Sequence, residues 1–264
     1  MRLGALGALA ALGLLAAGCG GGSTSPDDIA KAADKTAQVG SLEANFDISG
    51  QGIQGSGSGV FNTGQGRSGQ LTMNVTTRDS SGGLRQIPVD TVVTGDVFYM
   101  RSPAFAQATS QGKEWIKLDL AKLAQQRGVE VGGFLDASPT PTNALAYLGG
   151  TSDVKKVGSE LVRGTKTTHY RVTSDLQRAA DHASGSEQTA LKRIVAQSGR
   201  KTLPLDVWVD GNGYIRKVNY LEHPGGQQAA TVAMVLHDFG RPVAITPPPK
   251  GSVVDLMNAL QPGG

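Results

Sequence analysis

The sequence predicts an α+β fold in which one curved antiparallel sheet of about ten strands carries helices on one side. Three observations lead to this prediction. Apolar and polar residues alternate in many short segments, which is typical of strands with one face toward water. Helical patterns with an apolar stripe interrupt these segments. The chain contains 37 glycines in 264 residues, and glycine inside strands favours bulges and bends.

The chain begins with an uncharged run rich in alanine and leucine, residues 3–17, behind Met1 and Arg2. The run is shorter than the ~20 apolar residues that span a bilayer. It has the length of the apolar region of a secretory signal. We therefore expect residues 1–18 to be an export signal, which ends directly before Cys19, the only cysteine in the sequence.

The segment Leu15-Ala16-Ala17-Gly18-Cys19 resembles the lipobox of bacterial lipoproteins. The resemblance implies that the Cys19 thiol is alkylated with diacylglycerol, that cleavage makes Cys19 the first mature residue, and that its amine can also be acylated. Two or more acyl chains anchor a protein stably, whereas one holds only marginally. Residues 19–28 would then be a lipidated tether and residues 29–264 a single domain. The alternative is an ordinary signal peptide with an incidental cysteine.

The elements follow in order from local patterns. A helix is expected from Pro26 to about Val39, because proline and the aspartates behind it suit a helix start and Gly40 suits an end. Glycine turns, such as residues 94–96, favour an antiparallel meander. Strands are expected at residues 42–48, 60–61, 71–75, 87–94, 97–100, 115–118, 155–162, 166–173, 205–209, 214–222 and 229–238. Further helices are expected at residues 118–126, 143–148, 174–197 with a break at 184–186, and 253–260 in a tail along the sheet edge or rim.

Composition and motifs argue against nucleic-acid binding and catalysis. The net charge is only +3, and the basic residues are scattered. Residues 50–55 match G-x-G-x-x-G, but turn and strand are expected behind them, not the helix that must meet a pyrophosphate. His169, His182, His223 and His237 lack the spacing of a helical metal pair, and no G-x-S-x-G elbow is present. We expect no enzyme, no metal and no cofactor.

Several motifs occur in order behind the lipobox. They are Gly95-Asp96-Val97-Phe98-Tyr99-Met100-Arg101, Trp115-Ile116-Lys117-Leu118-Asp119, Leu203-Pro204-Leu205-Asp206-Val207-Trp208-Val209-Asp210, Gly213-Tyr214-Ile215-Arg216-Lys217-Val218 and Asp238-Phe239-Gly240-Arg241-Pro242-Val243. With them, residues 41–249 resemble the actinobacterial lipoproteins typified by LprG and LppX, which share a fold with the LolA and LolB lipoprotein carriers. The resemblance implies a half-barrel sheet with helices packed on its concave face, and an apolar cavity for acyl chains or a glycolipid.

The residues give this cavity a physical rationale. Glycine-rich strands let the sheet curl, and small alanines on the helices leave room between the two layers. Flexible chains suit such a space, and methionine adapts to irregular contents. The alternative is that the same side chains close into a filled core. The expected lining is Phe46, Ile48, Leu71, Met73, Val75, Val93, Leu145, Leu148, Leu191, Ile194, Val207, Val209, Met234 and Leu236.

The leading functional hypothesis is a lipoprotein anchored at the outer face of the plasma membrane. It would bind acyl chains of a lipid or glycolipid and carry or present them in the cell envelope, with a lipid exporter as one source. The second hypothesis, from a different class, is an anchored scaffold or sensor that binds another envelope protein. Neither hypothesis involves nucleic acid.

Overall fold

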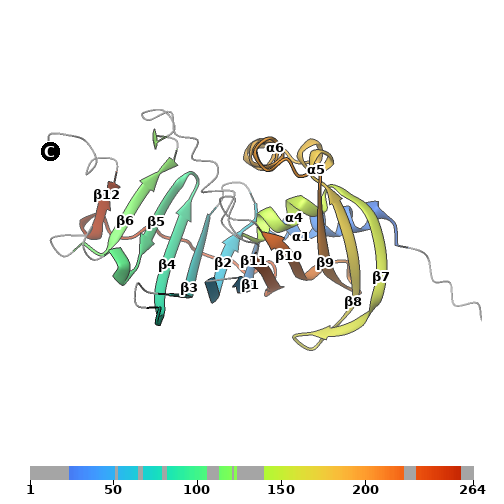
Figure 1. Ribbon diagram of the computed structural model, residues 1–264, viewed down its shortest axis with the longest axis horizontal. Helices are drawn as coiled ribbons and strands as arrows, with labels where there is room; N and C mark the ends of the chain where they lie inside the picture. The colour runs from blue at the N-terminus through green and yellow to red at the C-terminus, as the bar shows by residue number, and fades with distance from the viewer. Residues whose placement is uncertain are drawn as a thin grey trace, which may run out of the picture.

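The computed structural model describes residues 24–50, 53–64, 68–78, 82–105, 113–120, 122–123, 140–222 and 230–256. Twelve strands form one sheet in the order β12-β6-β5-β4-β3-β2-β1-β11-β10-β9-β8-β7. Four α-helices lie in these ranges, and Figure 1 shows them gathered near the β7–β10 end, where the sheet curves around them. The α+β prediction is confirmed, with twelve strands in place of about ten.

The strands alternate in direction across the sheet, except that β12 runs parallel to its neighbour β6. The strands are β1 (Ser41–Gly50), β2 (Ile53–Asn62), β3 (Ser68–Arg78), β4 (Leu84–Thr94), β5 (Val97–Arg101), β6 (Trp115–Asp119), β7 (Thr151–Val162), β8 (Thr165–Asp175), β9 (Thr202–Asp210), β10 (Ile215–Glu222), β11 (Ala230–His237) and β12 (Val253–Asp255). The α-helices are α1 (Pro26–Ala37), α4 (Pro141–Leu148), α5 (Leu176–His182) and α6 (Gly185–Ser198).

The C-terminal tail differs from the prediction. The expected helix at residues 253–260 is wrong at its start, because residues 253–255 form β12 and pair with β6, with Val253 opposite Trp115. Two β-branched valines fit a strand, and the edge of β6 offers unpaired backbone groups. Residues 257–260 lie outside the described ranges. Of the tail expected along the sheet edge or rim, residues 253–255 lie at the edge.

Helix α1 is held at its start and near its end. Ser25, and not an aspartate, is the N-cap, and it exchanges hydrogen bonds with Asp28 in a capping box. The buried Thr36 hydroxyl donates to the Ala32 carbonyl oxygen at 2.7 Å and accepts from the Ile215 backbone N–H at 2.9 Å. This second bond fixes α1 to strand β10.

The large hydrophobic core lies between the helices and the strands on either side of β11. It includes Phe46 on β1, Leu148 on α4, Val207 on β9 and Met234 on β11, each at most 1% exposed. A much smaller cluster, centred on Phe98, occupies the other half of the sheet. The two halves of one sheet therefore pack very differently.

Strand β2 separates these two halves. Its glycine Gly57 pairs with Phe46 on one side and Met73 on the other. A Cβ atom added at Gly57 would lie 2.3 Å from the Thr72 carbonyl oxygen and 2.7 Å from Met73 Cγ. The absent side chain thus lets β3 approach closely.

The residues that match G-x-G-x-x-G, 50–55, run from the end of β1 into β2. They are followed by a strand and not by a helix, as expected.

Candidate functional site

The helix-side face of strands β3–β6 is apolar and partly open. Met73 shares the face of Phe46, because pairing through Gly57 aligns the two, so Leu71 and Val75 also face the helix side. Leu71 continues in register through Thr91 to Met100. Leu71, Val75 and Met100 remain partly exposed, while the main helix contacts of the sheet fall on β7, β8 and β10.

A crevice continues from this face toward the helices. A pocket of about 70 Å³ lies against Phe61, Val93 and Phe98, beside the start of α4. It shares Gly95 and Thr142 with a crevice of about 600 Å³. That volume falls within the range of small-molecule sites, ~300–1,000 Å³. The crevice extends along α1 and α4 past Ala33, Ala37, Leu145 and Ala146, and its rim carries Asp34, Asp96, His182 and Glu187.

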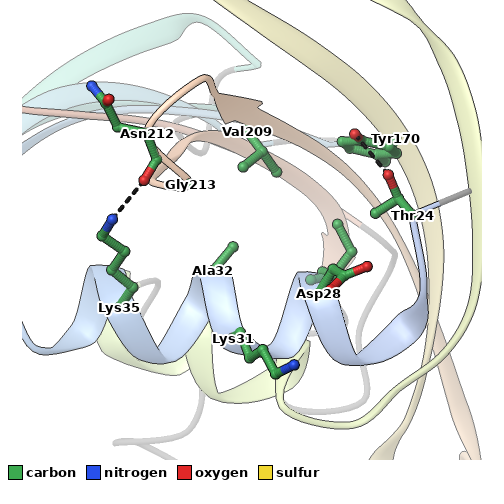
Figure 2. Close-up of a pocket in the computed structure, with 10 residues that line it drawn as sticks. Thr24, Asp28, Lys31, Ala32, Lys35, Tyr170, Val209, Asn212 and Gly213 are labelled. Carbon is green, nitrogen blue, oxygen red and sulfur yellow. Dashed lines mark hydrogen bonds between the residues drawn. The ribbon is translucent and has the colours of Figure 1, made fainter. Parts of the chain in front are cut away.

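A second cavity, of about 390 Å³, separates α1 from strands β8 and β9 (Figure 2). Ala32 on the helix and Val209 on the sheet both point into this space. At one end, Lys35 Nζ donates to the Asn212 carbonyl oxygen at 2.6 Å. At the other, the Thr24 hydroxyl donates to the Tyr170 hydroxyl at 3.0 Å. The small side chain of Ala32 leaves room here between α1 and the sheet.

The fourteen residues expected to line one cavity lie on the inner face of the sheet or on α4 and α6, but they do not meet around one space in the described ranges. Seven belong to the large core, and four more pack at its margin. Val93 packs beside the smaller cluster, Met73 is buried and Val75 is partly exposed. The seven core residues are Phe46, Leu145, Leu148, Leu191, Val207, Met234 and Leu236. The four marginal residues are Ile48, Leu71, Ile194 and Val209.

Four cavities, two of them adjoining, each touch one of these fourteen residues. Val93, Leu145 and Val209 line the three spaces described above. Leu236 lines a fourth, of about 220 Å³, beside Arg163 in the β7–β8 turn. The open space therefore lies around the margins of the packed core and over β3–β5.

Sequence reasoning missed some residues of the open face. Thr91 and Met100 lie at its centre, and Phe61 and Phe98 line its pocket. The segment Val97–Arg101 is apolar at several consecutive positions, so alternation alone does not assign its inner face. The pairing Val93 to Phe98 identifies it, and that pairing could be anticipated from the tight Gly95 turn.

Three described histidines each pair with an aspartate. His169 Nε2 lies 2.8 Å from Asp206 Oδ1, and its ring stacks on Trp208 with centroids 4.1 Å apart. His182 Nε2 lies 3.1 Å from Asp34 Oδ1. Within the described ranges, no hydroxyl is hydrogen-bonded to these rings or to that of His237. These pairs therefore lack the adjoining nucleophile of a catalytic triad. His223 lies outside the described ranges.

His237 belongs to a polar network at the junction of β1 and β11. Its Nδ1 lies 2.6 Å from Asp238 Oδ2, and its Nε2 lies 2.8 Å from Asn45 Oδ1. The hydrogen bond with His237 lowers the pKa of Asp238 below its ordinary value, and the charge of Arg241 acts in the same direction. Glu43 also lies within 4.8 Å. Because both His237 nitrogens are already engaged, we read the group as a structural network.

The predicted anchor lies outside the described part of the chain, which begins at Thr24. Residues 1–18 and Cys19 are therefore an expectation from sequence alone. Among the described helices, none combines the length and the apolar character needed to cross a membrane.

Comparison with known proteins gives relatives in Streptomyces. An uncharacterised 31.2 kDa protein of Streptomyces griseus, encoded between rplA and rplJ, is 30% identical over 217 residues, which is 78% of this chain and 70% of the relative. A Streptomyces coelicolor protein named as a candidate lipoprotein is 24% identical over 248 residues, 91% of this chain and 78% of that protein. No protein-family model matches the chain.

The solved structure of LprF gives the same fold. LprF from Mycobacterium bovis superposes with a TM-score of 0.51 at 16% identity, covering 86% of this chain and 99% of LprF. The lipoprotein LppX of Mycobacterium tuberculosis has a TM-score of 0.44 at 14% identity, covering 84% and 97%. Together with the Streptomyces griseus relative and the ordered motifs, the fold shared with LprF identifies the family. The chain belongs to the actinobacterial lipoproteins of the LppX and LprG type.

Proposed function

We propose that this protein is anchored through Cys19 at the outer face of the plasma membrane and binds acyl chains of a lipid or glycolipid. Residues 1–18 would be the export signal, 19–28 the lipidated tether and 29–264 one lipid-binding domain of LolA-like fold. The domain would carry or present its lipid in the cell envelope, with an exporter as one source. The proposal includes no catalysis, cofactor or nucleic acid.

One observation carries the proposal: the helix-side face of β3–β6 is apolar yet only partly covered, and it leads to the crevice along α4. Met100 and Val75 lie at the exposed part of this face, and Phe61, Val93 and Phe98 line the pocket beside it. Apolar surface left in water is unfavourable by ~25 cal/mol per Å². An acyl chain laid on this face would remove apolar surface from water on both partners.

The same transfer free energies allow the protein to release a bound acyl chain to a membrane. Each methylene gains ~0.8 kcal/mol when it leaves water, but a bilayer shields that methylene equally well. Moving a chain between the membrane and the protein is therefore close to balanced. A carrier that must both load and unload needs this balance.

Native mass spectrometry of the mature protein tests lipid binding. We expect acyl-containing ligand to co-purify in stoichiometric amount. Leu71→Trp should cover the centre of this open face and remove most of the ligand. Gln70→Trp, the neighbouring position on the opposite, exposed side of β3, is the matched control and should retain it. Ligand-free protein that also fails to take up a fluorescent fatty acid would contradict the proposal.

Anchoring is tested separately from cargo. The mass of the N-terminal peptide should show a diacylglyceryl group on Cys19, and Cys19→Ser should prevent processing at that residue. An unmodified Cys19 in mature, membrane-bound protein would remove the anchor from the proposal but leave the lipid site in place.

A further inference from the structure

The outer edge strand β7 exposes large apolar side chains. Leu161 is 72% exposed and Val157 is 49% exposed. Within the described ranges, the other exposed large apolar side chains are Leu84 and Leu221, which lie on β4 and β10. The β7–β8 hairpin thus concentrates exposed apolar surface that contributes nothing to the core.

The same hairpin is basic. Lys155, Lys156, Arg163 and Lys166 are all exposed. With two acidic residues, residues 153–166 carry a net charge of +2. Within the described ranges, no ion pair engages Lys155, Lys156 or Lys166. Exposed leucine and valine among unpaired lysines make a surface suited to an interface of apolar chains and anionic headgroups.

The described chain begins beside this hairpin. The Thr24 hydroxyl donates to the Tyr170 hydroxyl at 3.0 Å, and Tyr170 pairs in register with Lys156. Figure 1 shows α1 starting next to β7 at the same end of the sheet. Thr24 follows Cys19 by five positions, so the two lie at most about 17 Å apart. An anchor on Cys19 would hold β7 close to the membrane.

We propose that the β7–β8 hairpin docks on an anionic lipid surface, with Leu161 and Val157 entering the headgroup region and the lysines meeting lipid phosphates. This inference rests on the anchoring in the proposed function and not on its cargo. Docking fixes the orientation of the domain, with β7 at the membrane and the open face of β3–β6 on the far side of the helices.

Lipid-borne quenchers measure the docking directly. The lipidated mature protein is reconstituted into phosphatidylcholine vesicles with or without 30% phosphatidylglycerol. A fluorophore is placed at Leu161→Cys or, as a matched control, at Leu84→Cys, which is 71% exposed on β4. We expect strong quenching at position 161 in anionic vesicles, much less in neutral vesicles, and little at position 84 in either.

Charge is tested in the same vesicles. Each basic residue near an anionic surface changes binding about fivefold, so Lys155→Gln with Lys156→Gln should lower the docked-to-undocked ratio about 25-fold. The pair Lys122→Gln with Lys250→Gln, exposed near the other edge of the sheet, should leave it unchanged. Equal effects of the two pairs would overturn the proposal.

The remaining outcomes separate the two proposals. A protein that floats with the vesicles but is equally quenched at positions 161 and 84 contradicts docking alone. A protein that does not float contradicts the anchor and, with it, the docking. A stable dimer in which Leu161 is buried before any vesicle is added would assign this edge to a second copy of the chain and overturn the membrane proposal.

Discussion

The two halves of the sheet share the same alternation of apolar and polar residues, but their inward side chains differ in burial. In β1 and β8–β11, inward side chains such as Phe46 and Val207 meet helices and are almost fully buried. In β3–β5, inward residues such as Leu71 and Met100 stay partly exposed. Alternation in the sequence tells which face is apolar, but it does not tell what covers that face. The covered half forms the large core, and the open half leaves apolar side chains partly exposed.

Core truncation should show the largest difference between the halves. Phe46→Ala removes a ring that is 1% exposed and packs edge-on against Phe61, so we expect a loss of about 3–5 kcal/mol of unfolding free energy. Met100→Ala on the open face should cost less than about 1.5 kcal/mol. Urea denaturation measures both, and equal losses would mean that the open half is packed as tightly as the covered half.

Adding a single methyl group at the boundary between the halves, on β2, should destabilise the fold. At Gly57 the new Cβ would meet the β3 backbone, so Gly57→Ala is expected to cost about 1–3 kcal/mol. Gly158→Ala in β7 is the control, because no atom lies within 4 Å of its Cβ position, and its effect should stay within about 0.5 kcal/mol. Thermal unfolding of the two variants distinguishes them.

A charge on the open face should separate binding from stability. Val75→Asp leaves a partly exposed carboxylate solvated in the free protein, but an acyl chain would have to bury it without a partner. We expect acyl affinity to fall about tenfold or more, with a stability change below about 1 kcal/mol. Thr76→Asp, on the opposite face of β3, should bind normally in the same titration. Equal affinities would place the lipid elsewhere.

The smallest effect concerns the edge of the open half. Lys117 Nζ lies 2.9 Å from Asp255 Oδ2, and this hydrogen bond raises the pKa of Lys117. The pair's stabilisation is therefore complete below the ordinary lysine pKa of 10.5 and is lost as pH rises through the higher pKa of the folded state. Lys117→Gln should lower the free energy of unfolding by at most about 1 kcal/mol. If the fluorescence of Trp115 changes when the pH rises through the pKa of Lys117, the variant should lose that change. A change that persists in the variant would come from another titrating group.

The sequence predicted local elements better than their partners. The proline at position 26 and Gly40 delimit α1, and alternation locates most strands, because these signals act within a few residues. Strand β12 was missed since its conformation depends on β6, more than 130 residues earlier. The expected cavity residues lie on the inner face of the sheet or on the helices, but which of them pack and which stay open depends on where the helices lie. That position is fixed by distant contacts such as Thr36 with Ile215.

Strand β12 affects whether copies of the protein associate through their sheet edges at high concentration. A bare β6 would present a row of unpaired amides next to an apolar surface, which is a template for strand addition between copies. The three residues of β12 occupy that row in parallel orientation. Removing the end of the chain from Lys250 onward would therefore invite linear polymerisation of a protein that remains folded.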